Sequence, residues 1–276
     1  MNKQINATSR RILGVNATIV YVFFYAPILL LVAFSFSDDE LVGRWGGFTL
    51  RWYEAFADNE NVQRALTVSI RVALVSTLVS VVLGTMAALA LERYRFRGNK
   101  FFDALLYLPV IVPDVTMAVM MLLFFAAGRN LLDNLFGVTF AKGVATVTLS
   151  HIAFSISFVS IVVRARIAGM SQRLEEAAQD LYATRFQSFR HVTLPLILPG
   201  VIGGALLSLT LSLDDVVITQ FAAGPGSTTL PVFVFGLIRR GVTPLINAVS
   251  VVMLAISIAL VLLSLLAQRA RGSSAT

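Results

Sequence analysis

The sequence contains no cysteine, which excludes a disulfide framework and a thiolate metal site. Charged residues make up only 13% of the chain, about half the share of a typical soluble domain. The phosphate-binding motif GxxxxGK[ST] and the zinc-protease motif HExxH are missing, and the chain has only two histidines. These absences predict that the chain is not an enzyme and that it holds no metal and no cofactor of its own.

Apolar residues are abundant: the chain is 57% hydrophobic, and its mean hydropathy is +0.81. A helix that spans a membrane needs about 20 mainly apolar residues. Six segments are long enough, namely 15–36, 72–91, 104–127, 143–163, 196–221 and 245–267. A seventh run, from Thr228, is too short to span and predicts a short helix at one membrane surface. We therefore predict an all-α integral membrane protein with six transmembrane helices, forming one domain over residues 1–276.

The basic residues indicate the orientation, because Lys and Arg are enriched in cytoplasmic loops. With the N-terminus inside, most Lys and Arg residues fall on inner segments, while the acidic residues from Asp38 to Glu60 fall on the first outer loop. Both termini and the segment 164–195 are therefore predicted to be cytoplasmic, in a protein of the cell inner membrane. The same topology accounts for the net charge of +7, so the expected partner is membrane lipid and not nucleic acid.

The inner segment LEEAAQDLYATRFQSFRHVTLPLILPG, from Leu174 to Gly200, has an ordered polar pattern. An i, i+3, i+4, i+7 spacing relates Leu174, Ala177, Ala178 and Leu181. This spacing predicts a short helix with one narrow apolar stripe, and Ser171 is placed to cap its start. The stripe suits either a protein partner or the headgroups of a lipid surface.

A second short helix is predicted to begin near Thr184 and to carry Phe186. Pro195 and Pro199 follow, and we expect them to bend the chain into the fifth span.

Three acidic residues lie inside the predicted spans: Asp114, Asp214 and Asp215. A carboxylate at a helix centre costs about 2.5 to 3.5 kcal/mol on insertion scales, so such residues usually face a cavity or a partner. Because no Lys or Arg lies in these spans, a cationic ligand is the natural complement. The alternative is that the acids bond to backbone or pair with a basic residue on another helix, such as Arg71.

Two features of the spans leave further questions open: the adjacent acids of the fifth span and the histidine of the fourth. Asp214 and Asp215 are neighbours on the fifth span and are expected to lie about 100° apart on its helix, so at most one points straight into a pathway. His151, in the fourth span, either lines a cavity or is packed and hydrogen-bonded, and the second arrangement is favoured.

The stretch EEAAQDLYATRFQSFRHVTLPLILPG resembles the cytoplasmic loop of ABC importer permeases, in which EAA is followed, after three residues, by glycine. The resemblance implies the type I ABC importer permease fold, with a loop at about 164–195 whose short helices dock on a nucleotide-binding subunit. The coupling residues that it implies are Leu174, Glu176, Ala177, Ala178, Leu181, Tyr182 and Phe186. Tyr182 occupies the glycine position, where the helix breaks into a turn and a permissive residue is favoured.

The stretches LPVIVPDVTMAVMMLLFF and LSLDDVVITQFAAGPGSTTLPV are similar to the permease subunits of spermidine/putrescine importers. This resemblance implies polyamine import, with Asp114 and Asp215 as substrate contacts. It also implies two ATPase subunits that bind ATP and Mg, a second similar permease, and an external binding protein. Leu245 stands where the relatives commonly have Glu, which bears on substrate preference.

Two alternatives remain at this point. One is the same machine with another substrate, such as an opine, an amino-sugar derivative or aminoethylphosphonate. The other is a secondary transporter or channel driven by an ion gradient.

Overall fold

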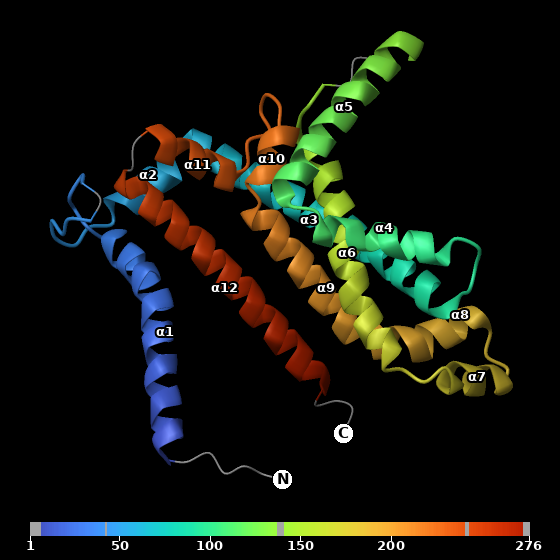
Figure 1. The fold of residues 1–276 in the computed structure, drawn as a ribbon. Coiled ribbons are helices and arrows are strands. Elements are labelled where there is room, and N and C mark those ends of the chain that lie inside the picture. The colour runs from blue at the N-terminus through green and yellow to red at the C-terminus, as the bar shows by residue number, and fades with distance from the viewer. Residues whose placement is uncertain (1–6, 42, 137–140, 241–242, 273–276) are drawn as a thin grey trace. The chain divides into compact units, whose positions relative to one another are not determined.

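The computed structural model describes residues 7–41, 43–136, 141–240 and 243–272, and the regular elements within them are helices (Figure 1). The chain forms two compact units. The first contains the described residues up to Glu60 together with Gly236–Ile256, and the second contains Asn61–Phe235 together with the described residues from Ser257. The predicted single membrane domain stays a prediction.

The first unit begins with α1 (Ala7–Phe34), an apolar helix long enough to span a membrane. The chain after α1 folds back on itself at an isolated bridge between Ser37 and Phe48, and α2 (Arg51–Asp58) follows. Trp52 of α2 donates its Nε1–H to the carbonyl of Ser37 at 2.8 Å. This bond fixes the start of α2 against the folded loop.

Three long helices form the centre of the second unit: α3 (Glu60–Arg93), α6 (Val144–Ala168) and α9 (Leu194–Asp214). Two glycines allow α3 and α9 to approach α6 at Val159. A Cβ on Gly84 of α3 would lie 2.8 Å from the Val159 Cβ, and one on Gly204 of α9 would lie 3.2 Å from the Val159 Cα. Such close packing of backbones is how helices associate in a membrane, where burial from water contributes little.

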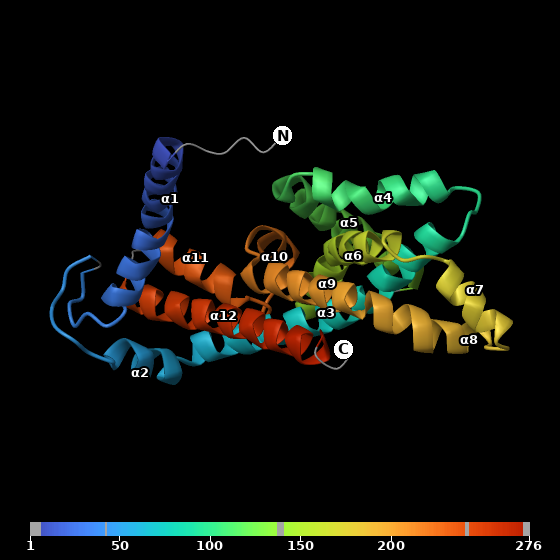
Figure 2. The same cartoon turned by 90° about the horizontal axis from the view of Figure 1, so that it is seen from below.

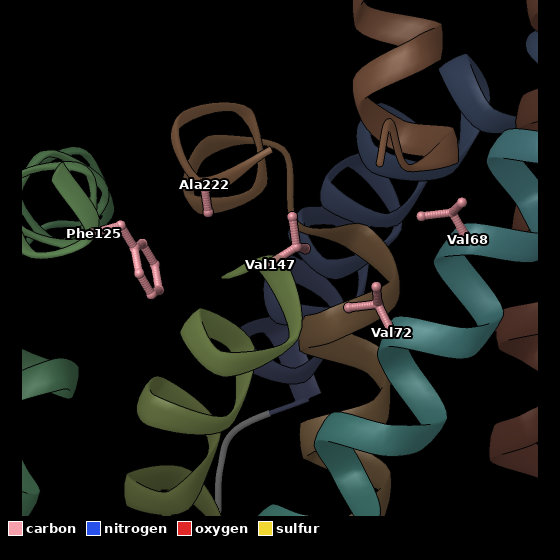
Figure 3. Packing of buried hydrophobic residues seen from close by; sticks show 5 residues of the cluster. All are labelled: Val68, Val72, Phe125, Val147 and Ala222. Carbon is pink, nitrogen blue, oxygen red and sulfur yellow. The ribbon is translucent and has the colours of Figure 1, made fainter. Parts of the chain in front are cut away.

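A second contact region brings α3, α5, α6 and α10 together. Its buried residues, drawn in Figure 3, are Val68, Val72, Phe125, Val147 and Ala222. This cluster holds α5 at Phe125 and α10 at Ala222 beside α6, and these helices frame the site described below.

The predicted third span is not one helix. The chain forms α4 (Asn99–Ile111) and α5 (Asp114–Phe136), which are bent by 113° relative to each other. Pro113 is the cause, because it restricts the residue before it to extended backbone and lacks an amide donor. Val112 accordingly has φ −75° and ψ 131°. Before the bend, α4 contacts α6 (Figure 2).

The predicted fifth span also ends earlier than expected. Helix α9 stops at Asp214, Asp215 is extended with ψ 128°, and a separate short helix, α10 (Val217–Ala222), follows. The expectation that Asp214 and Asp215 lie 100° apart on one helix is therefore wrong, since the helix ends between them.

The inner segment forms the two short helices that the sequence predicts, α7 (Arg173–Asp180) and α8 (Arg185–Ser188). One π-helical turn, Phe189–Thr193, connects α8 to α9 immediately before Pro195. Because Pro195 cannot donate to the preceding turn, a widened turn at this place is the expected accommodation.

The run from Thr228 forms α11 (Leu230–Arg240), and α12 (Pro244–Gly272) is the last helix. Among the described residues, five helices are long and apolar enough to span a membrane, or six if the bent pair α4–α5 is one span. The prediction of six spans is therefore confirmed when α4 and α5 together are counted as one broken span. The orientation of the chain across the membrane stays a prediction.

Candidate functional site

A cavity of about 270 Å³ opens where the two broken spans meet α6. Its lining residues are Pro109, Asp114, Met117, Phe154, Phe158, Leu211, Asp214, Asp215, Val216, Val217 and Ile218. All three acids singled out from the sequence are among them, and the lining contains no Lys or Arg. The two helix breaks explain the convergence: Asp114 begins α5 after the bend, whereas Asp214 and Asp215 flank the end of α9.

Two of these acids are free to meet a ligand. Asp114 and Asp214 are both exposed, and neither has a hydrogen bond or an ion pair with another described residue. A carboxylate in this condition depends on water or on an incoming cation for its partners. The arrangement therefore offers two unneutralised negative charges on an otherwise apolar wall.

The third acid is held by the protein. Asp215 Oδ2 accepts hydrogen bonds from the amide and the hydroxyl of Thr219, both at 2.7 Å, and Oδ1 accepts the Ile218 amide at 3.3 Å. His151 Nε2 lies 3.4 Å from Oδ2. The Asp215 carboxylate thus satisfies amides at the start of α10 while it lines the cavity. The pairing with Arg71 that the sequence left open is not what holds it.

His151 is packed and hydrogen-bonded, as the sequence favoured. It is fully buried on α6, with Nδ1 2.7 Å from Ser212 Oγ and Nε2 2.9 Å from Thr219 Oγ1. Its ring lies 5.3 Å from that of Phe154, a cavity-lining residue, measured between centroids. Sequence reasoning missed the link to Asp215, because 64 positions separate the two residues and no local spacing connects them.

An ion-pair cluster joins α4 to the centre of the unit. Arg164 of α6 donates its Nε–H to Glu92 of α3 at 2.8 Å and its Nη1–H to Asp103 of α4. The Arg164 guanidinium also lies 5.9 Å from the Tyr107 ring centroid. These contacts fix α4, the helix that leads to the bend and to Asp114. No local spacing in the sequence indicates this cluster, because its members lie on three different helices.

The predicted coupling segment, α7 and α8, presents its apolar side chains to the outside. Leu181 is 81% exposed and Phe186 is 69% exposed, and Leu174, Glu176 and Ala177 are exposed as well. Ser171, which was predicted to cap the helix, lies one residue before the N-cap position that Gln172 occupies, and its Oγ accepts the Arg173 amide at 3.3 Å. Within the described part of its own unit these side chains remain exposed, which suits docking on another subunit.

Tyr182 has the backbone conformation of the glycine that it replaces. Its φ is +64°, and it is the only non-glycine residue with positive φ among those described. The Ala183 amide donates to the Ala178 carbonyl at 3.1 Å, and the Tyr182 amide donates to the Gln179 carbonyl at 2.9 Å. These two bonds form a Schellman motif, in which the left-handed position is usually glycine. The departure seen in the sequence therefore leaves the helix end intact and places strain at Tyr182.

We expect Tyr182→Gly to stabilise the end of α7, because a left-handed non-glycine residue costs about 1 kcal/mol or more. Tyr182→Ala retains the Cβ and should gain nothing, so it is the matched control. The measurement is the rate of limited proteolysis at Arg185 in the purified protein. Equal protection in the Gly and Ala variants would contradict the assignment of strain.

Glu175 makes contacts between helices that sequence reasoning missed. Its Oε1 lies 3.1 Å from Arg93 Nη2 at the end of α3 and accepts the Thr193 hydroxyl at 2.7 Å. Its carbonyl also accepts the Ser188 hydroxyl at 3.4 Å. Glu175 therefore ties α7 to α3 and to the start of α9, while the adjacent Glu176 remains exposed. The sequence indicated only that both acids favour the start of a helix.

Comparison with known proteins identifies the family of this chain. Residues 80–272 match the family described as binding-protein-dependent transport system inner membrane component. The chain belongs to this family. The permease is 40% identical to the putrescine transport system permease protein PotI of Escherichia coli (strain K12), over 85% of this chain and 82% of the relative. It is 37% identical to the spermidine/putrescine transport system permease protein PotC of Haemophilus influenzae, over 91% of this chain and 94% of the relative.

The fold matches a solved structure of a bacterial ABC transporter involved in the import of the acidic polysaccharide alginate. The TM-score is 0.75, 92% of each chain is covered, and the sequences are 20% identical, so the likeness concerns the fold alone. The predicted ABC importer permease fold is confirmed. As an inner membrane component of a binding-protein-dependent system, the permease is not catalytic, and ATP is bound by a partner ATPase.

Proposed function

We propose that the permease forms half of the translocation pathway of an ATP-driven importer of polyamines. It pairs with a second, similar permease, works with two copies of an ATPase, and accepts its substrate from an external polyamine-binding protein. Relatives named for putrescine and spermidine transport, at 40% and 37% identity over most of the chain, support this substrate class.

The cavity is the structural observation that carries the proposal. A polyamine leaving its binding protein loses part of its hydration, and uncompensated ammonium groups in a low-dielectric space are costly. Asp114 and Asp214 supply two free carboxylates, and Asp215 supplies a third that is already oriented. No Lys or Arg among the lining residues competes for them. A chain of methylene groups between ammonium ions also suits the apolar wall between these acids.

The coupling segment accounts for the energy input. In this proposal, α7 and α8 dock on the ATPase, and ATP-driven closure moves α7. Glu175 joins α7 to Arg93 of α3, and α3 runs on to the helices that bear the cavity. Motion at the docking surface therefore has a direct mechanical route to the substrate site.

The function is tested with the whole importer reconstituted in proteoliposomes that hold ATP on the ATPase side. We expect saturable uptake of radiolabelled putrescine that spermidine inhibits and aminoethylphosphonate does not. Omission of the ATPase is the control and should abolish uptake. Uptake that persists without ATP and follows an imposed proton gradient would instead support a secondary transporter. Inhibition by aminoethylphosphonate alone would support the other substrate class.

A further inference from the structure

A buried polar chain runs from the cavity wall into the helix bundle. It connects Asp215, Thr219, His151 and Ser212, and Ser212 Oγ lies 3.2 Å from Ser76 Oγ of α3. The chain thus links α10, α6, α9 and α3 at the point where α9 breaks. His151 is its centre, with one ring nitrogen toward the cavity acid and the other toward α9 and α3.

The hydrogen bonds place a proton on Nε2 of His151. The Thr219 hydroxyl donates to Asp215 Oδ2, so its oxygen accepts the proton on His151 Nε2. Nδ1 lies 2.7 Å from Ser212 Oγ. A proton on Nε2 satisfies the contact with Thr219 and faces the Asp215 carboxylate, whose Oδ2 lies 3.4 Å away.

We infer that His151 is a positioning residue for the transport site, a role that rests on the proposed function. Through Nε2–H and Thr219 it fixes the orientation of the Asp215 carboxylate, and through Ser212 it ties the break after α9 to α3. Asp215 lies on extended backbone between two helices, where helix geometry does not hold its side chain. The packed histidine adds to the constraint that the Thr219 and Ile218 amides already impose, and substrate affinity depends on it although His151 does not line the cavity.

The test replaces His151 by Gln or by Asn, because the side-chain amides of these residues imitate different nitrogens of the imidazole. The side-chain nitrogen of Gln reaches the region of Nε2, whereas that of Asn reaches only the region of Nδ1. We expect His151→Asn to raise the KM for putrescine by about tenfold, the size of a lost hydrogen bond to a charged group, with the maximal rate near wild type. His151→Gln should restore most of the affinity.

Ser155→Ala is the matched control, because it removes a buried hydroxyl from the same helix that has no hydrogen-bond partner in the described chain. It should leave the KM unchanged. An unchanged KM in His151→Asn, or equal KM values in the Asn and Gln variants, would overturn the inference. If His151→Asn does not reach the membrane, Thr219→Val and Thr219→Ser decide: the Val variant should raise the KM and the Ser variant should not, and equal values would overturn it.

The double variant separates positioning from general damage. If His151 acts through Asp215, adding His151→Asn to Asp215→Asn should leave the KM of the single Asp215 variant unchanged. If the double variant instead has a KM raised by the product of the two single-variant factors, the inference is contradicted. Asp114→Asn, measured in the same proteoliposomes, tests the proposed function separately. If Asp114→Asn raises the KM and His151→Asn does not, only the positioning role fails, whereas transport insensitive to every acid variant contradicts the proposed site itself.

Discussion

Asp114→Asn and Asp214→Asn are each expected to reduce the efficiency of putrescine uptake by about tenfold to a hundredfold. Each variant removes one free carboxylate from the cavity and keeps the size and the hydrogen-bonding capacity of the side chain. A hydrogen bond to a charged partner contributes about 1.5 to 3 kcal/mol, and every 1.4 kcal/mol corresponds to a factor of ten. Initial rates of radiolabelled putrescine uptake over a concentration series give the ratio of maximal rate to KM.

The controls separate charge in the cavity from charge elsewhere. Asp58→Asn removes an exposed acid outside the cavity and should leave uptake unchanged. ATP hydrolysis without substrate and the amount of permease in the membrane should match wild type in every variant. If both cavity variants transport putrescine normally, these acids do not contact the substrate, and the electrostatic argument for a cationic ligand fails.

Asp215→Asn is a less direct test, although resemblance favours Asp215 as a substrate contact. Its carboxylate accepts hydrogen bonds from Thr219 and Ile218 and lies beside His151. Loss of its charge therefore alters the start of α10 as well as the cavity. The structure adds Asp214 to the informative variants, because its carboxylate has no such contacts.

Most of the fold could be predicted from the sequence because membrane spans are long, apolar and uncharged. The two errors, at 104–127 and 196–221, have the same origin. A hydropathy window records apolar character and not backbone direction, so an apolar run interrupted by Pro113 or ended at Asp214 still reads as one span. The intramembrane acids marked both places, because polar groups and irregular backbone are tolerated within a membrane where they line a cavity.

The candidate site was predictable in its residue types and not in its connections. Residue chemistry indicates that Asp114, Asp214 and Asp215 need a cavity or a partner, and the structure places them on one wall. The contacts that hold the functional regions join residues far apart in the chain, such as His151 with Asp215 at the cavity and Glu175 with Arg93 between α7 and α3. A single sequence carries no record of such pairs, because they depend on how the helices pack. Tyr182 is the opposite case, since its motif position alone indicated the left-handed turn.

The second large effect is expected at the docking surface. Ala178→Asp and Glu176→Lys should leave the permease in the membrane but abolish its coupling to the ATPase, so that binding protein and putrescine no longer stimulate ATP hydrolysis. Glu176 is exposed and Ala178 is half-buried at the end of α7, beside the exposed Leu181. A new charge or a reversed charge at such a surface leaves an unpaired, desolvated group when the partner docks, which costs several kcal/mol. Stimulated ATP hydrolysis and co-purification of the ATPase are the two measurements.

Matched variants make this result specific to docking. Ala178→Ser adds a small polar group without charge and should retain most of the coupling. Glu175→Gln alters the adjacent acid, whose contacts are within the permease. It should weaken the link between α7 and α3 and therefore lower stimulated hydrolysis, while the ATPase still co-purifies. Loss of co-purification in Ala178→Asp together with its retention in Glu175→Gln would distinguish the surface that binds the ATPase from the contact that transmits its motion. Full stimulation in Ala178→Asp and in Glu176→Lys would remove α7 from the docking surface.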